Sequence, residues 1–343
     1  MNTKQVVATL AVVGSVAAFA MLNMTSIATN ESFIAAPVSE QERSFQSFVA
    51  KNHKTYGTKE EYAYRLGVFS QNYHTIMAHN MHGKAKFTMG INKFSDMTSQ
   101  EYKKMLGFKP SKLRATKVPK VLGAVQLPDS VDWRDSAVTP VKNQGQCGSC
   151  WSFSTTGSIE GINAIKTGSL VSLSEQQLVD CSSSFGNEGC NGGMFDAAFK
   201  YTEGAKLETE DEYPYTAQDG QCNYDASEGE VGAVSYEDVT SNSPSELAAA
   251  VAQQPVSVAI EADQSVFQSY TGGIINSADC GTQLDHAVLV VGFGNDGTTD
   301  YWILKNSWGS DWGESGYFRI IRDMNGADAG ICGLQSQPAY PTM

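Results

Sequence analysis

The sequence predicts an α+β protein of two packed lobes, with a mostly helical segment in front of them. In the body of the chain (residues 127–343), helical patterns come first and strand-like runs follow. The charge also changes at this boundary. Residues 1–126 carry 16 Lys and Arg against 7 Asp and Glu, whereas the body carries 8 against 30. All seven Cys and all five Trp lie in the body. A cleft between the two lobes is the expected place for a functional site.

The N-terminus has the composition of a secretory signal peptide. One early lysine is followed by a largely apolar run from Val6 to Met21, which is shorter than a membrane span needs. We expect a signal over residues 1–20, with its end between 20 and 28, and no membrane span after its removal. An oxidising compartment follows, where an odd cysteine count predicts disulfides and one free thiol. The net charge of −13 argues against nucleic acid as a partner.

The front of the chain reads as two patterned stretches and a linker. Residues 40–80 are rich in helix formers, and seven of them recur along one side of a helix: Glu61, Arg65, Val68, Phe69, Asn72, Ile76 and Asn80. The alternation over Gly90–Asp96 predicts a strand. Residues 109–126 contain two prolines and several lysines without periodicity, which is typical of an exposed, cleavable linker.

The body begins with helices and continues with strands. A helix is expected from Ser149, a possible N-cap, to about Lys166, because Gly168 follows it. A second helix is expected over residues 174–180. Four runs rich in β-branched and aromatic residues predict strands, namely residues 255–262, 286–294, 301–309 and 316–323.

The pair Cys147 and Cys150 allows three interpretations. A redox pair belongs on a helix after a buried strand, and the polar residues before Cys147 do not provide that context. A zinc site needs two further ligands at short spacing, which are missing. The third interpretation is a nucleophile, because the start of a helix and a nearby imidazolium both lower the pKa of a thiol. Cys150 starts the predicted helix. A histidine with apolar neighbours is more often a core residue, but His286 is the only histidine in the body, which favours it as the general base and acid.

Acyl transfer by such a pair requires two further groups. The Gln144 side-chain amide and the Cys150 backbone N–H are candidate donors to an oxyanion. The side-chain oxygen of Asn306 is a candidate to orient the imidazole, and Trp308 could shield that contact from water. Each residue alone also suits an ordinary loop, turn or core position. It is their joint presence that favours nucleophilic catalysis.

Several motifs together resemble one known family. The segment QGQCGSCWSF around Cys150 closely resembles the nucleophile segment of papain-like cysteine proteases. LDHAVLVVGFG and LKNSWG resemble the histidine and asparagine segments, and CNGG (Cys190–Gly193) resembles the strip that binds substrate backbone. The helix pattern over Glu61–Asn80 and the pattern over Gly90–Asp96 resemble the pro-segment motifs of the cathepsin L-like branch. The resemblance covers roughly residues 40–343.

The resemblance implies a specific set of site residues. Cys150 would be the nucleophile, His286 the base and acid, Asn306 the orienting residue and Gln144 the oxyanion donor, with Asp285 tuning the pair. It implies the disulfides Cys147–Cys190, Cys181–Cys222 and Cys280–Cys332. Substrate would be bound by Gly192, Gly193, Met194, Phe195, Ala259, Leu284, Ala287, Trp308 and Gln337. The apolar walls of the second subsite predict Leu, Phe or Val two residues before the scissile bond, and no preference for Arg there.

The resemblance also implies how the chain is organised and regulated. An inhibitory pro-segment (residues 29–108) would lie backwards through the cleft of a papain-like peptidase domain over residues 127–343, with a mainly helical left lobe and a β-barrel-like right lobe. Removal of the pro-segment at acidic pH would activate a cysteine endopeptidase that uses no cofactor and no metal. Expected partners are polypeptide substrates, the pro-segment itself and cystatin-like inhibitors. We expect a monomer in the secretory pathway, in a lysosome or digestive vacuole or outside the cell.

Three other functions remain as alternatives. An inactive homologue acting as a binding or inhibitory protein would typically lack Cys150 or His286, and this chain has both. A non-proteolytic cysteine enzyme would not need the pro-segment patterns or CNGG. An exopeptidase usually carries an inserted loop that blocks the cleft, and the sequence shows no such insertion.

Overall fold

The computed structural model describes residues 39–343, apart from residues 84, 111–118, 120, 123–125 and 327. The predicted signal peptide and most of the predicted linker therefore lie outside the described residues. The helices are α1 (Glu40–Lys51), α2 (Lys59–Met81), α3 (Ser99–Lys103), α4 (Cys150–Thr167), α5 (Glu175–Cys181), α6 (Phe195–Thr202), α7 (Pro244–Val251) and α8 (Ser265–Gln268). Short 3₁₀ helices cover Ser183–Phe185, Gly189–Asn191, Ala278–Cys280 and Ile331–Gly333. The strands are β1 (Phe87–Met89), β2 (Val131–Asp132), β3 (Ser235–Asp238), β4 (Val256–Ile260), β5 (Tyr270–Ile275), β6 (His286–Asn295), β7 (Asp300–Lys305), β8 (Tyr317–Ile321) and β9 (Ala339–Thr342).

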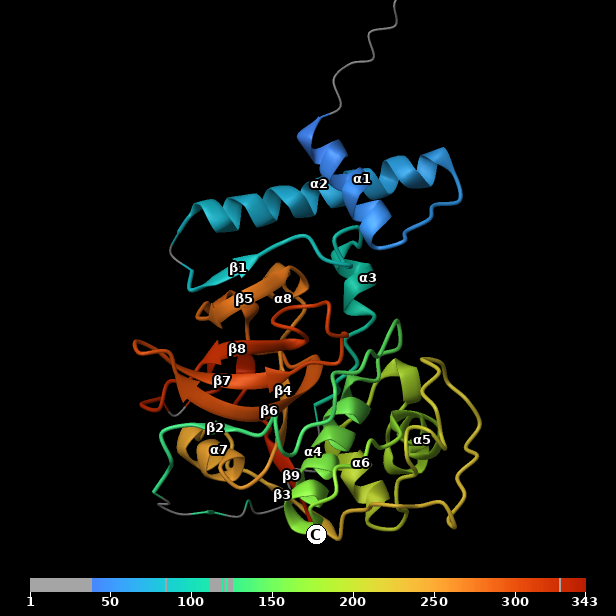
Figure 1. The fold of residues 1–343 in the computed structure, drawn as a ribbon, viewed down its shortest axis with the longest axis vertical. Coiled ribbons are helices and arrows are strands. Elements are labelled where there is room, and N and C mark those ends of the chain that lie inside the picture. Colours follow the sequence, from blue (N-terminus) through green and yellow to red (C-terminus); the bar gives the residue numbers. More distant parts are fainter. Residues whose placement is uncertain (1–38, 84, 111–118, 120, 123–125, 327) are drawn as a thin grey trace, which may run out of the picture. The chain divides into compact units, whose positions relative to one another are not determined.

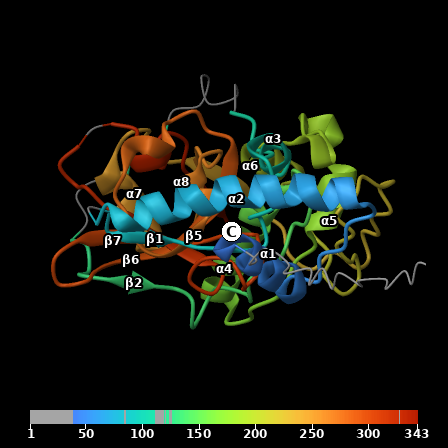
Figure 2. The same cartoon turned by 90° about the horizontal axis from the view of Figure 1, so that it is seen from above.

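The two long helices of the predicted pro-segment cross each other (Figure 1, Figure 2), and they pack through aromatic rings. Phe45 and Phe48 of α1 and Phe69 of α2 are buried, and each α1 ring lies 5.2 Å from the Phe69 ring between centroids. Aromatic contacts of this kind add to the free energy gained by burying the rings. The pro-segment therefore has a small hydrophobic core of its own.

The predicted periodic side of α2 faces the chain that follows it. Asn72 donates from Nδ2 to the carbonyl of Met97 at 3.1 Å, and Asn80 exchanges two hydrogen bonds with the backbone of Met89. Arg65 forms a two-pronged ion pair with Glu101 of α3 at 2.8 and 2.9 Å. These three polar members of the pattern thus hold the returning chain, and the apolar members Phe69 and Ile76 are buried.

The predicted strand over Gly90–Asp96 is wrong. The pro-segment strand β1 ends at Met89, and the next residues form a turn. The Asn92 side chain accepts a hydrogen bond from the Phe94 amide at 3.0 Å and donates to the carbonyl of Gln268 at 2.7 Å. A short polar side chain that bonds its own backbone competes with strand pairing, and a period of two cannot distinguish these outcomes.

Helices α4, α5 and α6 build the helical lobe around a shared apolar core (Figure 1). The helices predicted from Ser149 and over residues 174–180 are confirmed as α4 and α5. Ser149 is the N-cap of α4, but its hydroxyl does not cap the helix and instead lies 2.6 Å from the Tyr215 hydroxyl. Since α4 also contacts β6, it lies where the two lobes meet.

The second lobe is built on one sheet. Its strand order is β1-β5-β8-β7-β6-β4-β9-β3, with β2 paired to β6. Neighbours are antiparallel except for β5 and β8. The four predicted strands are confirmed as β4, β6, β7 and β8. Strand β1 belongs to the pro-segment, so the pro-segment extends the sheet of the body at β5.

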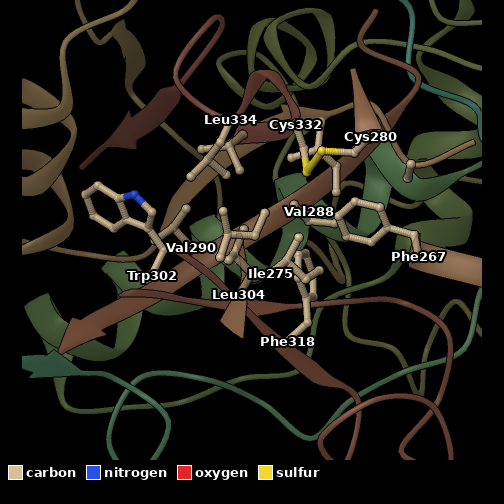
Figure 3. Packing of buried hydrophobic residues seen from close by; sticks show 14 of the residues in the cluster. Phe267, Ile275, Cys280, Val288, Val290, Trp302, Leu304, Phe318, Cys332 and Leu334 are labelled. Carbon is tan, nitrogen blue, oxygen red and sulfur yellow. A yellow bond between two sulfur atoms is a disulfide. The ribbon is translucent and has the colours of Figure 1, made fainter. Parts of the chain in front are cut away.

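The sheet packs around a large hydrophobic core, part of which is shown in Figure 3. Trp302, Leu304 and Val290 lie together there, and the Cys280–Cys332 disulfide lies at the edge of the same cluster.

The pairing of β4 with β6 fixes the position of His286, because His286 is the first residue of β6 and lies opposite Ile260 of β4. Among the described residues, no helix has the length and apolar character of a membrane span.

Candidate active site

Cys150 is the first residue of α4 and is fully buried. Its Sγ accepts a hydrogen bond from the backbone N–H of Ala287 at 3.4 Å, so the thiol lies beside the start of β6. The positive end of the α4 dipole also points at this sulfur. The sequence-predicted thiol and the histidine strand are thus brought together from positions 137 residues apart.

The His286 ring is fixed on one side and free on the other. Its Nε2 lies 2.8 Å from Oδ1 of Asn306, and that oxygen also accepts from the Ser307 amide at 2.8 Å. Because Oδ1 is an acceptor, Nε2 carries the hydrogen and Nδ1 has the lone pair. Among the described residues, Nδ1 has no hydrogen-bond partner. Trp308 stacks on the ring with centroids 4.6 Å apart and shields the contact with Asn306 from water.

Burial sets the charges of the pair. Burial raises the pKa of the Cys150 thiol to about 11, although hydrogen bonds from the backbone N–H groups of Ala287 and Gly107 lower that pKa in part. Burial also lowers the pKa of His286 to about 4, although the hydrogen bond to Asn306 raises that pKa in part. Both side chains are therefore neutral at pH 7 while the pro-segment covers them.

Gln144 has its amide group locked in one orientation. Its Oε1 accepts from the Ser307 hydroxyl at 2.7 Å, and its Nε2 donates at 2.8 Å to the carbonyl oxygens of Cys147 and Met105. Met105 belongs to the predicted pro-segment (residues 29–108). A pro-segment carbonyl therefore sits on the donor that was predicted to bind an oxyanion.

The pro-segment continues across the predicted backbone-binding strip. The amide of Gly193 donates to the carbonyl of Gly107 at 2.8 Å, and its own carbonyl accepts from Lys109 at 2.9 Å. Phe108 pairs with Gly193 in parallel and donates from its amide to the Asp285 carbonyl at 2.9 Å. Gly192, also in the predicted strip, has φ +112°.

Close approach explains the glycines at this crossing. A Cβ on Gly107 would lie 1.7 Å from the carbonyl oxygen of Gly148, next to the thiol, and a Cβ on Gly192 would lie 2.6 Å from the carbonyl oxygen of Gly107. Backbone cannot give way as a flexible side chain can. Only glycine therefore lets the pro-segment lie this deep.

Phe108 occupies the predicted second subsite. Its ring stacks on Phe195 with centroids 5.1 Å apart. It belongs to the apolar cluster of the helical lobe, which includes three further predicted subsite residues: Ala259, Leu284 and Ala287. Met194 and Gln337 are half-buried and lie outside that apolar cluster. The sequence did not single out Phe108, although an isolated aromatic residue just before a basic linker was a usable signal.

Two other aromatic residues of the predicted pro-segment pack against Trp308. The rings of Phe94 and Tyr102 meet it edge-on at 5.4 and 5.6 Å, and the Tyr102 hydroxyl donates to the carbonyl of Ala262 at 2.9 Å. Asp285 accepts from the Ala262 amide at 2.7 Å, and burial raises its pKa to about 7. Neither Met105 nor Gly107 was recognised in the sequence, because each acts by its place in the cleft.

Three disulfides join the pairs implied by the resemblance, Cys147–Cys190, Cys181–Cys222 and Cys280–Cys332, and Cys150 is the free cysteine. The first disulfide ties the loop that carries Gln144 to the CNGG strip. In the part of the chain that the structure describes, no group of three or more His, Cys, Asp or Glu side chains is arranged to hold a metal ion.

Comparisons with known proteins agree with this site. Residues 127–342 match the papain family cysteine protease model, and residues 45–102 match the cathepsin propeptide inhibitor domain. The chain is 44% identical to the probable cysteine protease RD21C of Arabidopsis thaliana over 313 residues, which are 88% of this chain and 68% of that protein. It is 42% identical to procathepsin L of Rattus norvegicus over 301 residues, 84% of this chain and 89% of that protein.

A solved structure shows the same fold with the pro-segment in place. Digestive procathepsin L 3 from the larval midgut of Tenebrio molitor superposes with a TM-score of 0.81 at 42% identity, covering 89% of this chain and 100% of that one. These matches confirm the predicted α+β, two-lobed fold and the expectation of a cathepsin L-like zymogen. This chain belongs to the papain family of cysteine proteases and carries a cathepsin propeptide inhibitor domain in front of the enzyme.

Proposed function

We propose that the activated chain is an endopeptidase that cleaves polypeptides through Cys150. The observation that carries this proposal is the free thiol at the start of α4, beside a histidine whose Nε2 is held by Asn306 and whose Nδ1 is unoccupied. Removing the pro-segment would expose the thiol, and the burial that raises its pKa would be relieved. A thiolate and imidazolium pair can then form, which is the reactive state of such a site.

The reaction follows from these positions. The Cys150 sulfur attacks the carbonyl carbon of the scissile bond, and Gln144 Nε2 and the Cys150 amide donate to the oxygen as it becomes negative. The C–N bond then breaks, and His286 gives its proton to the departing amine. Water, deprotonated by the same imidazole, attacks the thioester. The carboxylic acid product leaves and the thiol is restored.

The contacts of the pro-segment support its role as the inhibitor of this reaction. It occupies Gln144 with the Met105 carbonyl and the second subsite with Phe108. Its parallel pairing with Gly193 agrees with a chain that runs backwards and offers no correctly placed scissile bond. We propose residues 29–108 as this segment, residues 109–126 as the linker that is cut, and residues 127–343 as the enzyme.

One experiment tests the proposed function. Acid-treated full chain is incubated with an unfolded protein, and the new termini are identified by mass spectrometry. We expect internal cuts, most often with Phe, Leu or Val two residues before the bond, because Phe108 occupies an apolar pocket there. Trimming from the ends only would indicate an exopeptidase, and no cleavage would favour the inactive homologue. A preference for Arg at that place would contradict the pocket assignment.

We propose that acid triggers processing. Among the described residues, three ion pairs join lysines in front of the body to acids of the body: Lys93–Asp311 and Lys103–Asp263 from the proposed pro-segment, and Lys109–Glu188 from the first residue of the proposed linker. Carboxylates take up protons as the pH falls toward about 4. Asp285, beside Lys103, has its pKa raised to about 7 by burial, so it loses negative charge as the pH falls below that value.

The processing rate of the full chain should therefore be about tenfold higher near pH 4 than near pH 7, since each partly exposed pair contributes ~0.2–1 kcal/mol. Gel electrophoresis over time measures this rate. A variant with glutamine at Lys93, Lys103 and Lys109 is the control, and its rate at neutral pH should rise toward the acid value. The idea fails if wild-type processing is equally fast at both pH values.

Partners and location remain proposals with separate support. Three disulfides are typical of an oxidising compartment, so we propose the secretory pathway, ending in a lysosome, a digestive vacuole or the extracellular space. An active monomer and inhibition by cystatin-like proteins are proposed from the family resemblance alone.

A further inference from the structure

Two pro-segment side chains are seated in the cleft on opposite sides of Cys150. Phe108 lies in the apolar pocket beside Phe195. Lys103 forms an ion pair with Asp263, with 2.6 Å between Nζ and Oδ2. The Phe108 side is the side of the substrate's second subsite. The Lys103 side has no assigned role in substrate binding.

The order of contacts along the pro-segment identifies that second side. The Phe108 amide donates a hydrogen bond to the Asp285 carbonyl, and the Met105 carbonyl accepts one from the Gln144 side chain. Gln144 marks the place that the scissile carbonyl of a substrate will occupy. Going back along the chain, Tyr102 and Lys103 reach Ala262 and Asp263, beyond Gln144 as seen from Phe108. Groups in that direction face the amine half of a substrate, which leaves first.

Asp263 is also held next to the histidine that protonates the leaving amine. The amide of Ala262, its neighbour in the chain, donates to Oδ1 of Asp285 at 2.7 Å, and Asp285 directly precedes His286. The other oxygen of Asp263 accepts from Gln264 Nε2 at 2.5 Å. The carboxylate is thus fixed by its neighbours on the side of the cleft that faces the leaving group.

We propose that Asp263 makes the mature enzyme prefer Lys or Arg immediately after the scissile bond. This inference rests on the proposed function of the same cleft. The Asp263 side chain is 17% exposed and the Lys103 side chain 51% exposed, so an incoming cation can take the place of Lys103 from the solvent side. Glu261 adds negative charge around the same point. A glutamate at this substrate position meets like charge and is disfavoured.

The test uses full-length wild-type chain activated by acid, with active enzyme counted by a covalent thiol inhibitor. Four internally quenched peptides share a Phe two residues before the bond and differ only in the residue after it: Lys, Arg, Gln or Glu. Mass spectrometry confirms the cleaved bond. We expect kcat/KM to be about fivefold higher for Lys than for Gln, equivalent to about 1 kcal/mol, and lowest for Glu. The ratio should fall as salt is added.

Two variants locate the effect. Asp263→Asn keeps the shape and removes the charge, and it should bring the Lys-to-Gln ratio close to one. Glu188→Gln is the matched control, because Glu188 pairs with Lys109, which follows Phe108 at the start of the proposed linker, and it should leave the ratio at about five. Equal rates for Lys and Gln with wild-type enzyme, or a ratio unchanged in Asp263→Asn, would overturn the inference.

The failure of this inference is distinguishable from failure of the proposed function. If wild-type enzyme cleaves all four peptides equally, the protease assignment stands and the role of Asp263 is wrong. If it cleaves none, the proposed function itself fails. If Asp263→Asn does not fold, the wild-type ratio and its dependence on salt still decide the question.

Discussion

Cys150→Ala should reduce the hydrolysis rate by about 10⁴-fold or more, because loss of the nucleophile leaves no group that can form the acyl intermediate. The thiol is buried and accepts hydrogen bonds from backbone N–H groups, including those of Ala287 and Gly107, so alanine removes the chemistry with little change in packing. The measurement is kcat/KM on a peptide with Phe two residues before the bond. The variant cannot process itself, so its pro-segment is removed by a trace of wild-type enzyme that is afterwards inactivated by alkylation.

A matched control separates catalysis from folding. Ser152→Ala changes a single buried atom in the same turn of α4, where the hydroxyl donates to the Ser149 carbonyl at 2.8 Å. It should keep its rate within a few-fold of wild type, since loss of one neutral hydrogen bond costs about 1 kcal/mol. If Cys150→Ala and wild type were equally active, another residue would be the nucleophile and the mechanism would be wrong.

Gln144→Ala should lower kcat by about 10²–10³-fold with little change in KM. The amide donor stabilises negative charge that exists only in the transition state, so its loss affects the chemical step more than ground-state binding. The Ser307 hydroxyl, 2.7 Å from Gln144 Oε1, shows that the amide is already oriented for this task.

Gln146→Ala is the control for this prediction, because Gln146 is an exposed glutamine in the same loop. It should leave both kinetic constants close to wild type. A raised KM with unchanged kcat in Gln144→Ala would mean that Gln144 binds substrate and does not stabilise the oxyanion.

The parts of the site that were predictable are those with a local signal. Cys150 was visible because it starts a well-patterned helix, and His286 because the body contains no second histidine. The strand that begins at His286 and the strand that ends just before Asn306 were visible as apolar β-branched runs. The Gly90–Asp96 alternation misled because the Asn92 side chain bonds its own backbone, and hydrophobic periodicity carries no information on such bonds.

Contacts between distant charges were not predictable. Lys142 is mostly buried and lies 2.8 Å from Glu175 and 3.4 Å from Glu160, both fully buried acids. The two acids lie on different helices, and each alone reads as a solvated helix residue. The pairing of Lys103 with Asp263 is of the same kind. Such partners become visible only when the fold brings residues together that lie far apart in the chain.

Strand β1 has a consequence for how the enzyme is turned on. Phe87 and Thr88 of the pro-segment pair with Gly273 and Gly272 of β5, so a cut in the linker leaves the pro-segment hydrogen-bonded to the body. Before the cut, the tether keeps the inhibitor at an effective concentration in the millimolar range. After it, occupancy of the cleft depends on dilution. The same cut therefore yields more free enzyme in a dilute fluid than in a crowded vesicle.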